Sequence, residues 1–373
     1  MKKTLIVTLE YPPQIGGIAS YVYNLAAHLP KESVVVCAPK IKDDKEFDAK
    51  NQWLTVRVKP LFSFLWPRWL KLFFIVRRIV RREQIEQVFI HHTLPIGYVG
   101  LLSKKFFKIP YTIFLHGTDL RLGTKNRWKR KMFQAVCLGA QSIVVNSEFM
   151  RHELMNKLEG LKNALILHPC ASDIFLQPVS IERVNQLRAE LALGGKKVIL
   201  SVGRFIDGKG FPHLLNLWKD VLATIPNAVL VLIGDGSKRV ALIQQIQKNN
   251  LQNTVRLLGA VPYQNLPVYY QLADLFVLLT HADENKAESW GTVFLEAAAS
   301  GIPVVAGRVG GVEEAVENLI TGLVVDVYNR KATTTAIIEL LRNNNYAKQM
   351  GQAGRERVSK ELNWSEQIKQ IIN

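Results

Sequence analysis

The chain has 373 residues, more than one hydrophobic core ordinarily serves, so its length predicts about two domains. Hydrophobic residues make up 48% and charged residues 21%, a composition typical of globular proteins that excludes an intrinsically disordered chain. The formal net charge is +17, and most of the excess lies in residues 1–180, which hold 27 basic and 13 acidic residues.

The cysteines and the lengths of the apolar runs indicate the cellular compartment of the protein. The three cysteines, Cys37, Cys137 and Cys170, show neither pairing nor metal-ligand spacing, which suits a reducing compartment. The apolar run after Met1 stops at Glu10, too early for a signal peptide, and no stretch approaches the roughly 18–20 residues that cross a bilayer. We therefore expect a cytoplasmic protein that touches a membrane only at its surface.

Short apolar, β-branched runs alternate with helical patterns along the whole chain. Several of these runs are continuously apolar, as expected for strands buried on both faces of a parallel sheet. The alternation predicts two doubly wound α/β domains, with the boundary near Gln177–Ser180 or at Gly194-Gly195. The expected strands are Thr4–Leu9, Val34–Ala38, Trp53–Val58, Val88–His92, Tyr111–His116 and Ser142–Ser147, then Lys197–Gly203, Ala228–Gly234, Val255–Gly259, Leu275–Leu279, Pro303–Gly307 and Leu323–Asp326.

The segment after the first expected strand contains two adjacent glycines. Ligands of open α/β sheets bind beyond the carboxyl ends of the strands. Gly16 and Gly17 precede a helix beginning at Ile18, so backbone amides there can approach an anion closely. A flexible turn is the alternative reading. The pattern is not the GxGxxG of a Rossmann dinucleotide site, and Gly234-Asp235-Gly236 also lacks the third glycine.

A basic turn follows the first strand of the second half. In the run Gly203-Arg204-Phe205-Ile206-Asp207-Gly208-Lys209-Gly210, a guanidinium and an ammonium group bracket a tight turn before a helix. These two cations could hold a diphosphate, although a merely solvated basic turn is the alternative. The run lacks the residue order of a Walker loop.

Two carboxylates flank an expected helix start in the second half. Glu288 lies in the loop, Glu296 lies in the second helical turn, and Gly291, Thr292 and Val293 supply first-turn amides without intrahelical partners. Amides between two carboxylates could bind a phosphate together with sugar hydroxyls. Either glutamate by itself could equally be an ordinary helix-start acid.

Histidines follow two strands of the first half. His116 begins the run His116-Gly117-Thr118-Asp119 at a strand end, and His91-His92 stands at another. An isolated histidine in such a place can be packed or solvated as well as catalytic. No third ligand at a suitable spacing accompanies the pair, so we expect no metal site.

The ordered set of these motifs resembles the retaining glycosyltransferases of family four. The resemblance spans nearly the whole chain and also includes Gly301-x-Pro303, Gly310-Gly311 and Val261-Pro262-Tyr263. It implies the GT-B fold, an α/β architecture of two facing Rossmann-like domains with a deep cleft between them. Residues 1–180 would form the acceptor-side domain and 181–354 the nucleotide-sugar domain. Within residues 355–373, the final helix, around Trp364–Ile372, would return to the first domain. Some segments look most like bacterial phosphatidylinositol mannosyltransferases.

The resemblance also implies roles for individual residues. Arg204 and Lys209 would hold the donor diphosphate in place of a metal ion, without any cofactor. His116 would orient the donor sugar or stabilise the oxocarbenium-like transition state. Glu288 would bind sugar hydroxyls and Glu296 the ribose diol. The remaining donor contacts would be Gly16, Gly17, Val261, Gly291, Thr292 and Val293. GDP-mannose is the first choice of donor and a UDP-sugar the second, and the acceptor would be lipid-linked or a glycan.

A basic segment in the first half predicts a membrane-facing helix. If residues 68–82 are helical, Trp69, Leu72, Phe73, Val76, Ile79 and Val80 share one buried stripe. Leu70 and Phe74 fall outside it, among Lys71, Arg77, Arg78 and Arg81. Bases around exposed apolar residues are typical of a helix that lies on an anionic membrane. The protein would then be peripheral on the inner face of the cell membrane.

Three other functions remain compatible with parts of this pattern. A soluble UDP-sugar-dependent transferase would use the basic face only for solubility. A nucleic-acid binder also needs clustered bases and aromatics, but no nucleic-acid motif is present and the Glu288/Glu296 pair argues against one. A nucleotide-sugar epimerase shares the fold, whereas the two spaced glutamates favour transfer.

Overall fold

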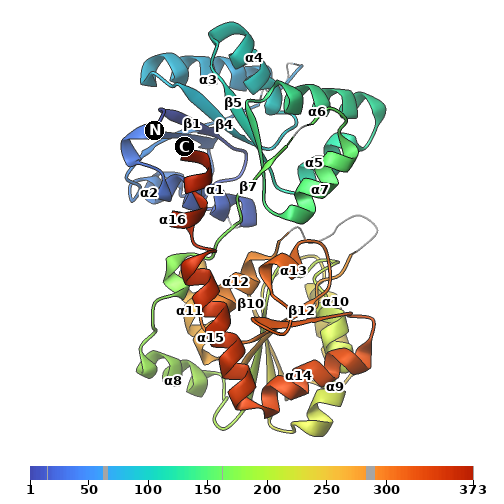
Figure 1. Ribbon diagram of the computed structural model, residues 1–373. Coiled ribbons are helices and arrows are strands. Elements are labelled where there is room, and N and C mark those ends of the chain that lie inside the picture. The colour runs from blue at the N-terminus through green and yellow to red at the C-terminus, as the bar shows by residue number, and fades with distance from the viewer. Residues whose placement is uncertain (15, 62–65, 162, 283–289, 373) are drawn as a thin grey trace. The chain divides into compact units, whose positions relative to one another are not determined.

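The computed structural model describes residues 1–14, 16–61, 66–161, 163–282 and 290–372 (Figure 1). Contacts divide the chain into two compact units, Met1–Pro169 with the segment from Trp364 onward, and Cys170–Asn363. The sequence placed these boundaries at 180/181 and 354/355 instead. The first difference arises because Phe175 is fully buried in the core of the second unit, edge-on to Tyr263 and Tyr270.

The first unit is a parallel sheet in the order β3-β2-β1-β4-β5-β6-β7 with helices on both faces (Figure 1). Its strands are β1 Thr4–Val7, β2 Val34–Pro39, β3 Leu54–Val58, β4 Gln87–His91, β5 Tyr111–Leu115, β6 Ser142–Val145 and β7 Leu165–Ile166. Its helices are α1 Gly17–His28, α2 Asp44–Asp48, α3 Leu70–Glu83, α4 Gly97–Phe107, α5 Thr118–Thr124, α6 Arg127–Gly139, α7 Glu148–Lys157, α16 Trp364–Gln367 and α17 Lys369–Ile372.

The second unit is a parallel sheet in the order β10-β9-β8-β11-β12-β13. Its strands are β8 Lys197–Val202, β9 Ala228–Ile233, β10 Val255–Gly259, β11 Leu275–Leu278, β12 Val304–Gly307 and β13 Gly322–Val325. Its helices are α8 Ile181–Glu190, α9 Phe211–Thr224, α10 Arg239–Lys248, α11 Leu266–Leu272, α12 Thr292–Ala299, α13 Val312–Ala315, α14 Arg330–Arg342 and α15 Asn344–Lys360.

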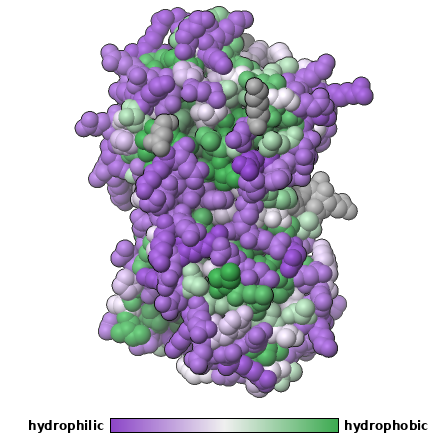
Figure 2. All heavy atoms as spheres, in the orientation of Figure 1, coloured by the Kyte–Doolittle hydropathy of each residue, from purple (hydrophilic) through white to green (hydrophobic). Residues whose placement is uncertain are grey.

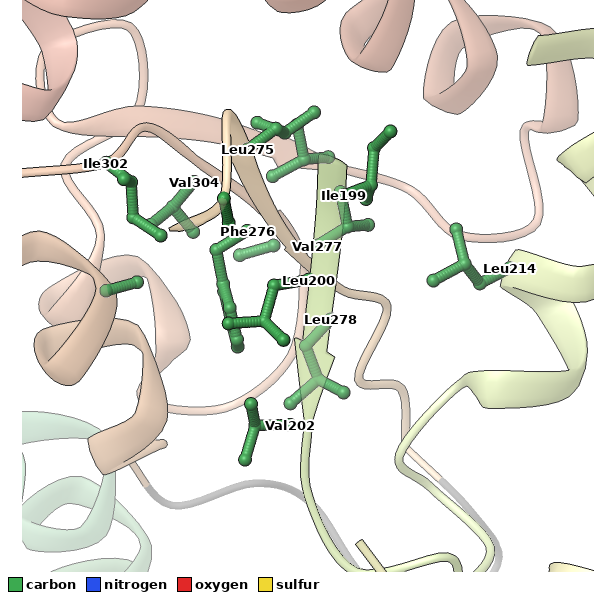
Figure 3. Close-up of a cluster of buried hydrophobic side chains, with 14 of the residues drawn as sticks. Ile199, Leu200, Val202, Leu214, Leu275, Phe276, Val277, Leu278, Ile302 and Val304 are labelled. Carbon is green, nitrogen blue, oxygen red and sulfur yellow. The ribbon is translucent and has the colours of Figure 1, made fainter. Parts of the chain in front are cut away.

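Each unit has its own hydrophobic core on its central strands. Figure 3 shows part of the second core, where side chains of β8 and β11 meet those of neighbouring elements. All six residues of β9 are buried, as a strand covered by helices on both faces requires. Figure 2 shows hydrophilic side chains over most of the visible surface of both units. The continuously apolar runs of the sequence are therefore the central strands.

The expected strands are all present, and several end one or two residues earlier than predicted. The strand β7 was not predicted, because two residues are too few to show a periodic pattern. The end of the chain, expected to return to the first unit within residues 355–373, does so from Trp364 onward. Helix α15 packs against α12 within the second unit, and only the segment from Trp364 onward joins the first.

The last residues of the chain are fastened to the first unit by aromatic and polar contacts. Trp364 is buried and lies edge-on to Tyr21, with their ring centroids 5.2 Å apart. Gln367 accepts a hydrogen bond of 3.0 Å from the backbone amide of His168 through Oε1. This end of the chain is therefore an integral part of the first unit.

Candidate functional site

Both sheets have a switch point, where strand order reverses and neighbouring loops diverge on either side of the sheet. In the first unit it lies between β1 and β4, and in the second between β8 and β11. Loops at the carboxyl ends of such strands leave a crevice that binds ligands in open α/β folds. Most of the residues singled out from the sequence follow these strands or their direct neighbours β5 and β9, and Val261 follows β10.

In the second unit, Arg204 stands on a loop held by its backbone. The amide of Phe205 donates to the carbonyl of Asp235 at 2.9 Å, and the amide of Lys238 donates to the carbonyl of Phe205 at 2.9 Å. The Phe205 ring is buried edge-on to Phe211. The Arg204 side chain is exposed and makes no hydrogen bond or ion pair with another described residue. A fixed backbone thus presents a guanidinium that is available to an anion.

Gly234 and Gly236 allow the loop after β9 to pack against the Arg204 loop, and this packing, rather than anion binding, accounts for both glycines. Both have positive φ, and a Cβ atom at Gly234 would stand 1.9 Å from the carbonyl oxygen of Gly203. A Cβ atom at Gly236 would stand 2.5 Å from the carbonyl oxygen of Phe205. Glycine is needed at both positions because the β9 loop lies directly against the β8 loop.

Lys209 lies at the far end of the β8 loop, just before α9. It is partly buried and is followed by Gly210, whose φ of 73° caps the helix in the left-handed region. A Cβ atom at Gly210 would stand only 1.8 Å from the carbonyl oxygen of Leu279, the residue directly after β11. The amide of His281 donates to the carbonyl of Gly208 at 3.0 Å. The loops after β8 and β11 are therefore in direct contact.

The start of α12 carries the next group of expected contacts. Gly291 is the N-cap with a φ of 87°, and Thr292 and Val293 occupy the first turn, half-buried. Their amides have no intrahelical acceptor, so they can bind an anion. Glu288 lies outside the described residues. Val261 follows β10 and packs, half-buried, against the core of this unit.

Glu296 is buried in the second turn of α12 with two tyrosine hydroxyls on its carboxylate. Tyr270 donates to Oε2 at 2.8 Å, and Tyr263 also donates to this group. Burial raises the pKa of Glu296 from its usual 4.5 to about 7, although both hydroxyls act in the opposite direction. No local pattern connects the tyrosines with Glu296, because they lie on other elements, η3 (Tyr263–Asn265) and α11.

In the first unit, His116 lies one residue beyond β5 and beside His91, the last residue of β4. Nε2 of His116 and Nδ1 of His91 are 3.0 Å apart. Burial lowers the pKa of His116 to about 4, with the nearby charge of Asp119 opposing this change. His116 is therefore a neutral imidazole at pH 7, one that could exchange hydrogen bonds with a ligand while carrying no charge.

Asp119 follows His116 in the sequence, but no role was predicted for it. Its Oδ2 accepts from the backbone amide of His116 at 3.1 Å, and its Oδ1 accepts from the amide of Thr93 at 3.0 Å. One carboxylate therefore ties the loop after β5 to the loop after β4. Its position three residues after His116 resembles the reach-back spacing of a capping side chain, which is the only local signal.

The Gly16-Gly17 loop approaches the same group of side chains. A Cβ atom at Gly16 would lie 3.3 Å from Oε2 of Glu10. The other oxygen of Glu10 lies 3.3 Å from Nε2 of His92. No described atom lies within 4 Å of the Cβ position at Gly17, so the fold leaves open space there. Glu10 and His92 are thus neighbours of the glycine loop that sequence spacing did not indicate.

The burial of the side chains of α3 agrees with most of the predicted buried stripe and differs from the prediction at two residues, Trp69 and Leu70. Leu72, Phe73, Val76, Ile79 and Val80 are buried as predicted, whereas Trp69 is only half-buried and stacks on Tyr98. Leu70, predicted to be exposed, is half-buried and packs against the core of the first unit. Leu70 is the first residue of the helix, and its contacts come from the core of the first unit rather than from the helix itself.

The remaining exposed residues of α3 form a basic patch with the end of α4. Phe74 is 52% exposed and Phe106 is 61% exposed. Their ring centroids lie 5.6 Å and 6.2 Å, respectively, from that of the buried Phe73. Arg78 and Arg81 are exposed, while Lys71 and Arg77 are partly buried, with Arg77 over the ring of Phe107. A shallow hollow of about 460 Å³ is lined by Phe74, Arg77, Arg78, Arg81 and Arg82. Phe74, Arg78, Arg81, Lys105 and Phe106 are called the basic patch below.

Family models cover most of the chain. Residues 15–164 match the model described as "Glycosyltransferase Family 4", and residues 183–357 match "Glycosyl transferases group 1". Among curated proteins, the chain is 26% identical over 98% of its length to a GDP-mannose-dependent alpha-(1-6)-phosphatidylinositol monomannoside mannosyltransferase of Mycobacterium tuberculosis, covering 95% of that protein. It is 27% identical to the monoacylated phosphatidylinositol monomannoside mannosyltransferase of Corynebacterium glutamicum, covering all of this chain and 97% of that protein.

Solved structures share the architecture of the chain. The Anabaena protein HepE in complex with UDP and glucose matches with a TM-score of 0.81 at 19% identity, covering 100% of this chain and 98% of that one. Sucrose-phosphate synthase from Thermosynechococcus elongatus matches with a TM-score of 0.79 at 22% identity, covering 99% and 97%. Together with the two parallel sheets, these matches confirm the expected GT-B fold of two Rossmann-like domains.

Proposed function

The chain belongs to glycosyltransferase family 4, and on that premise we propose that it transfers a hexose from a nucleotide-diphospho-sugar, first of all GDP-mannose, to a lipid-linked or glycan acceptor. The observation that carries this proposal is the switch point of the second unit. There an available guanidinium on a braced loop, a lysine, the first-turn amides of a helix and a buried carboxylate follow neighbouring strands.

Arg204 and Lys209 bind the donor diphosphate in this proposal. The backbone bonds around Phe205 fix the Arg204 loop before any ligand arrives, so little reorganisation is needed when charge develops on the leaving phosphate. The C1–O bond to the diphosphate breaks, and the acceptor oxygen forms the new C1–O bond on the same face of the sugar. The leaving phosphate takes the acceptor proton. The two side-chain cations would make a metal ion unnecessary.

Glu296 binds the ribose diol in its ionised form, because a carboxylate accepts two hydroxyl hydrogen bonds. Tyr270 and Tyr263 hold this carboxylate in place and keep part of it ionised at neutral pH. The amides of Gly291, Thr292 and Val293 bind phosphate oxygens, and Glu288 binds hydroxyls of the transferred sugar. His116, together with the open space at Gly17, contributes to the sugar end of the donor.

The decisive test is a donor screen with matched variants. Thermal shift with GDP-mannose, UDP-glucose and an ADP-sugar should show a preferred donor, since a ligand at 100 times its Kd stabilises by about 2.7 kcal/mol. Arg204→Ala and Lys209→Ala should each lower turnover about 100–1,000-fold, the usual effect of removing one preorganised charge donor. Lys248→Ala, on an exposed lysine at the end of α10, is the control and should keep normal turnover. Near-normal turnover in the first two variants would refute the diphosphate site.

A membrane-bound acceptor is the second part of the proposal. Two similar proteins act on phosphatidylinositol mannosides by name, and the basic patch combines two exposed phenylalanines with cationic side chains. In the part of the chain that the structure describes, no helix is long and apolar enough to span a bilayer. A surface contact of this composition gains both apolar burial and attraction to anionic lipid. The alternative is a UDP-sugar-dependent enzyme with an acceptor in solution.

Liposome flotation separates these two acceptor classes. Phe74→Ser should weaken binding to vesicles that contain anionic lipid, and replacing Arg78 and Arg81 with Gln should weaken it further, by about 1 kcal/mol per charge. High salt should remove only the second effect. Val240→Ser is the matched control, because Val240 is 66% exposed on α10 of the second unit. Unchanged flotation of the patch variants would exclude the patch as the membrane contact.

A further inference from the structure

The side chain of His91 faces His116 across two adjacent strands. Strands β4 and β5 are parallel neighbours, and His91 is paired in register with Phe114, two residues before His116. Residues two apart on a strand share one face, so His91 and His116 lie on the same side of the sheet. Their rings are nearly parallel, at 16°, and Nδ1 of His91 lies 3.0 Å from Nε2 of His116.

Among the described residues, only His116 forms a hydrogen bond with the His91 ring. Its side chain is completely buried and stacks on Phe114 at 4.4 Å, with Tyr21 edge-on at 6.0 Å. Nε2 of His91 is buried and has no hydrogen-bond partner among the described residues. Burial, reinforced by repulsion from the other two histidines, lowers the pKa of His91 well below its usual value. Each of the two rings therefore carries a single proton at pH 7.

Two tautomeric arrangements can form the bond between the rings. If His116 donated from Nε2, the proton of His91 would sit on its Nε2 as a buried N–H without an acceptor. If His91 donates from Nδ1, its Nε2 is only an unused lone pair. An orphaned buried N–H is rarer and costlier than an unfilled acceptor. The second arrangement is therefore the stable one.

The second arrangement fixes the proton of His116 on the other side of its ring. With Nε2 accepting from His91, His116 must carry its proton on Nδ1. That atom bonds to no described residue, and the side chain is only partly buried. The surrounding acids do not compete for it, since Asp119 accepts from backbone amides and Glu10 pairs with His92. An N–H donor thus points away from the core.

We propose that His91 is a positioning residue that holds His116 in the Nδ1–H tautomer, so that His116 donates a hydrogen bond to a hydroxyl oxygen of the donor sugar. The sugar contact rests on the proposed function, whereas the tautomer does not. His91 touches no substrate in this scheme. It acts by filling Nε2 of His116 and by setting the angle of that ring.

The tautomer can be measured without any turnover. In protein labelled with ¹⁵N-histidine, long-range ¹H–¹⁵N correlation spectra should show a protonated, pyrrole-type Nδ1 and an unprotonated, pyridine-type Nε2 for His116. The His116→Gln spectrum identifies the signals that belong to this residue. A His116 protonated on Nε2 in the wild-type protein would overturn the proposal, whether or not any His91 variant folds.

Kinetics with GDP-mannose tests the consequence for catalysis. His91→Leu removes the donor and should lower kcat about 10–100-fold, by analogy with the loss of a partner that orients a metal-ligating histidine, with little change in KM for the nucleotide sugar. His91→Asn places an amide N–H where Nδ1 stood and should restore most of the loss. Phe114→Leu disturbs the same packing without touching the hydrogen bond and should leave kcat within a few-fold of wild type.

The outcomes separate this proposal from the proposed function. Equal losses of kcat in His91→Leu, His91→Asn and Phe114→Leu would reduce His91 to a packing residue and overturn the proposal. If wild-type protein transfers sugar from no nucleotide donor, the proposed function fails, and the NMR result still decides the tautomer. Two results together would support the role of His91. The loss of kcat would be confined to His91→Leu, and His116 would carry its proton on Nδ1 in the wild type but show both tautomers in that variant.

Discussion

Replacing Glu296 with Gln should make the protein more stable and a poorer binder of nucleotide at the same time. Burial raises the pKa of Glu296 from 4.5 to about 7, so the folded state holds this proton more tightly than the unfolded state does. Stability must therefore fall as pH rises from about 4.5 to about 7 and level off above that range. Glutamine resembles the neutral acid in shape and never ionises.

The size of the effect follows from the two pKa values. Between pH 5 and pH 8, ionisation of Glu296 in the folded protein should cost about 2–3 kcal/mol relative to the Gln variant. Glu296→Gln should thus exceed wild type in free energy of unfolding at pH 8, and the gap should narrow to under about 1 kcal/mol at pH 5. Urea denaturation at the two pH values measures this difference.

Binding should change in the opposite direction. Only the ionised carboxylate accepts both ribose hydroxyls, so wild-type affinity for GDP should drop up to about tenfold from pH 8 to pH 6. The ratio of wild-type to variant affinity, from calorimetric titration, cancels the titration of the diphosphate itself. A variant that is destabilised equally at both pH values, or one that binds GDP as wild type does at pH 8, would refute the reasoning.

Three further predictions concern the tyrosines, the β8 loop and metal dependence. Tyr270→Phe removes a donor to Glu296 and should raise its pKa further, so GDP binding should weaken at pH 7 and recover at higher pH; an unshifted pH profile would contradict this. Gly210→Ala should lower the free energy of unfolding in urea by about 2 kcal/mol or more, because the new Cβ would clash with the backbone of Leu279. Gly195→Ala is the control: Gly195 also has a positive φ but no atom within 4 Å of the Cβ position, so this variant should lose only about 1 kcal/mol. Similar losses in both variants would show that the contact is unimportant. EDTA should leave sugar transfer essentially intact, and a loss that Mg²⁺ or Mn²⁺ restores would overturn the proposed use of Arg204 and Lys209.

The sequence by itself determined the local elements of this protein. Continuous apolar runs marked the central strands, since a strand covered on both faces can tolerate few polar side chains. The 3.6-residue period marked Leu72, Phe73 and Val76 as one buried stripe of α3, because helix geometry alone puts them on one face. The glycine-bounded turns that carry Arg204, Lys209 and His116 were also readable, since they follow predicted strands. These features depend on neighbours within a few residues along the chain.

The tertiary structure decided which of these loops meet. Strand order places β4 beside β5 and thereby joins His91 to His116, and the packing of α11 on the second core brings Tyr270 to Glu296. Leu70 turned toward the core because neighbouring elements, and not its own helix, supply its contacts. Pairing between distant strands is chosen by the burial of whole faces, which no local period records. The partners of the site residues, and with them the pKa of Glu296 and the tautomer of His116, therefore exist only in the folded chain.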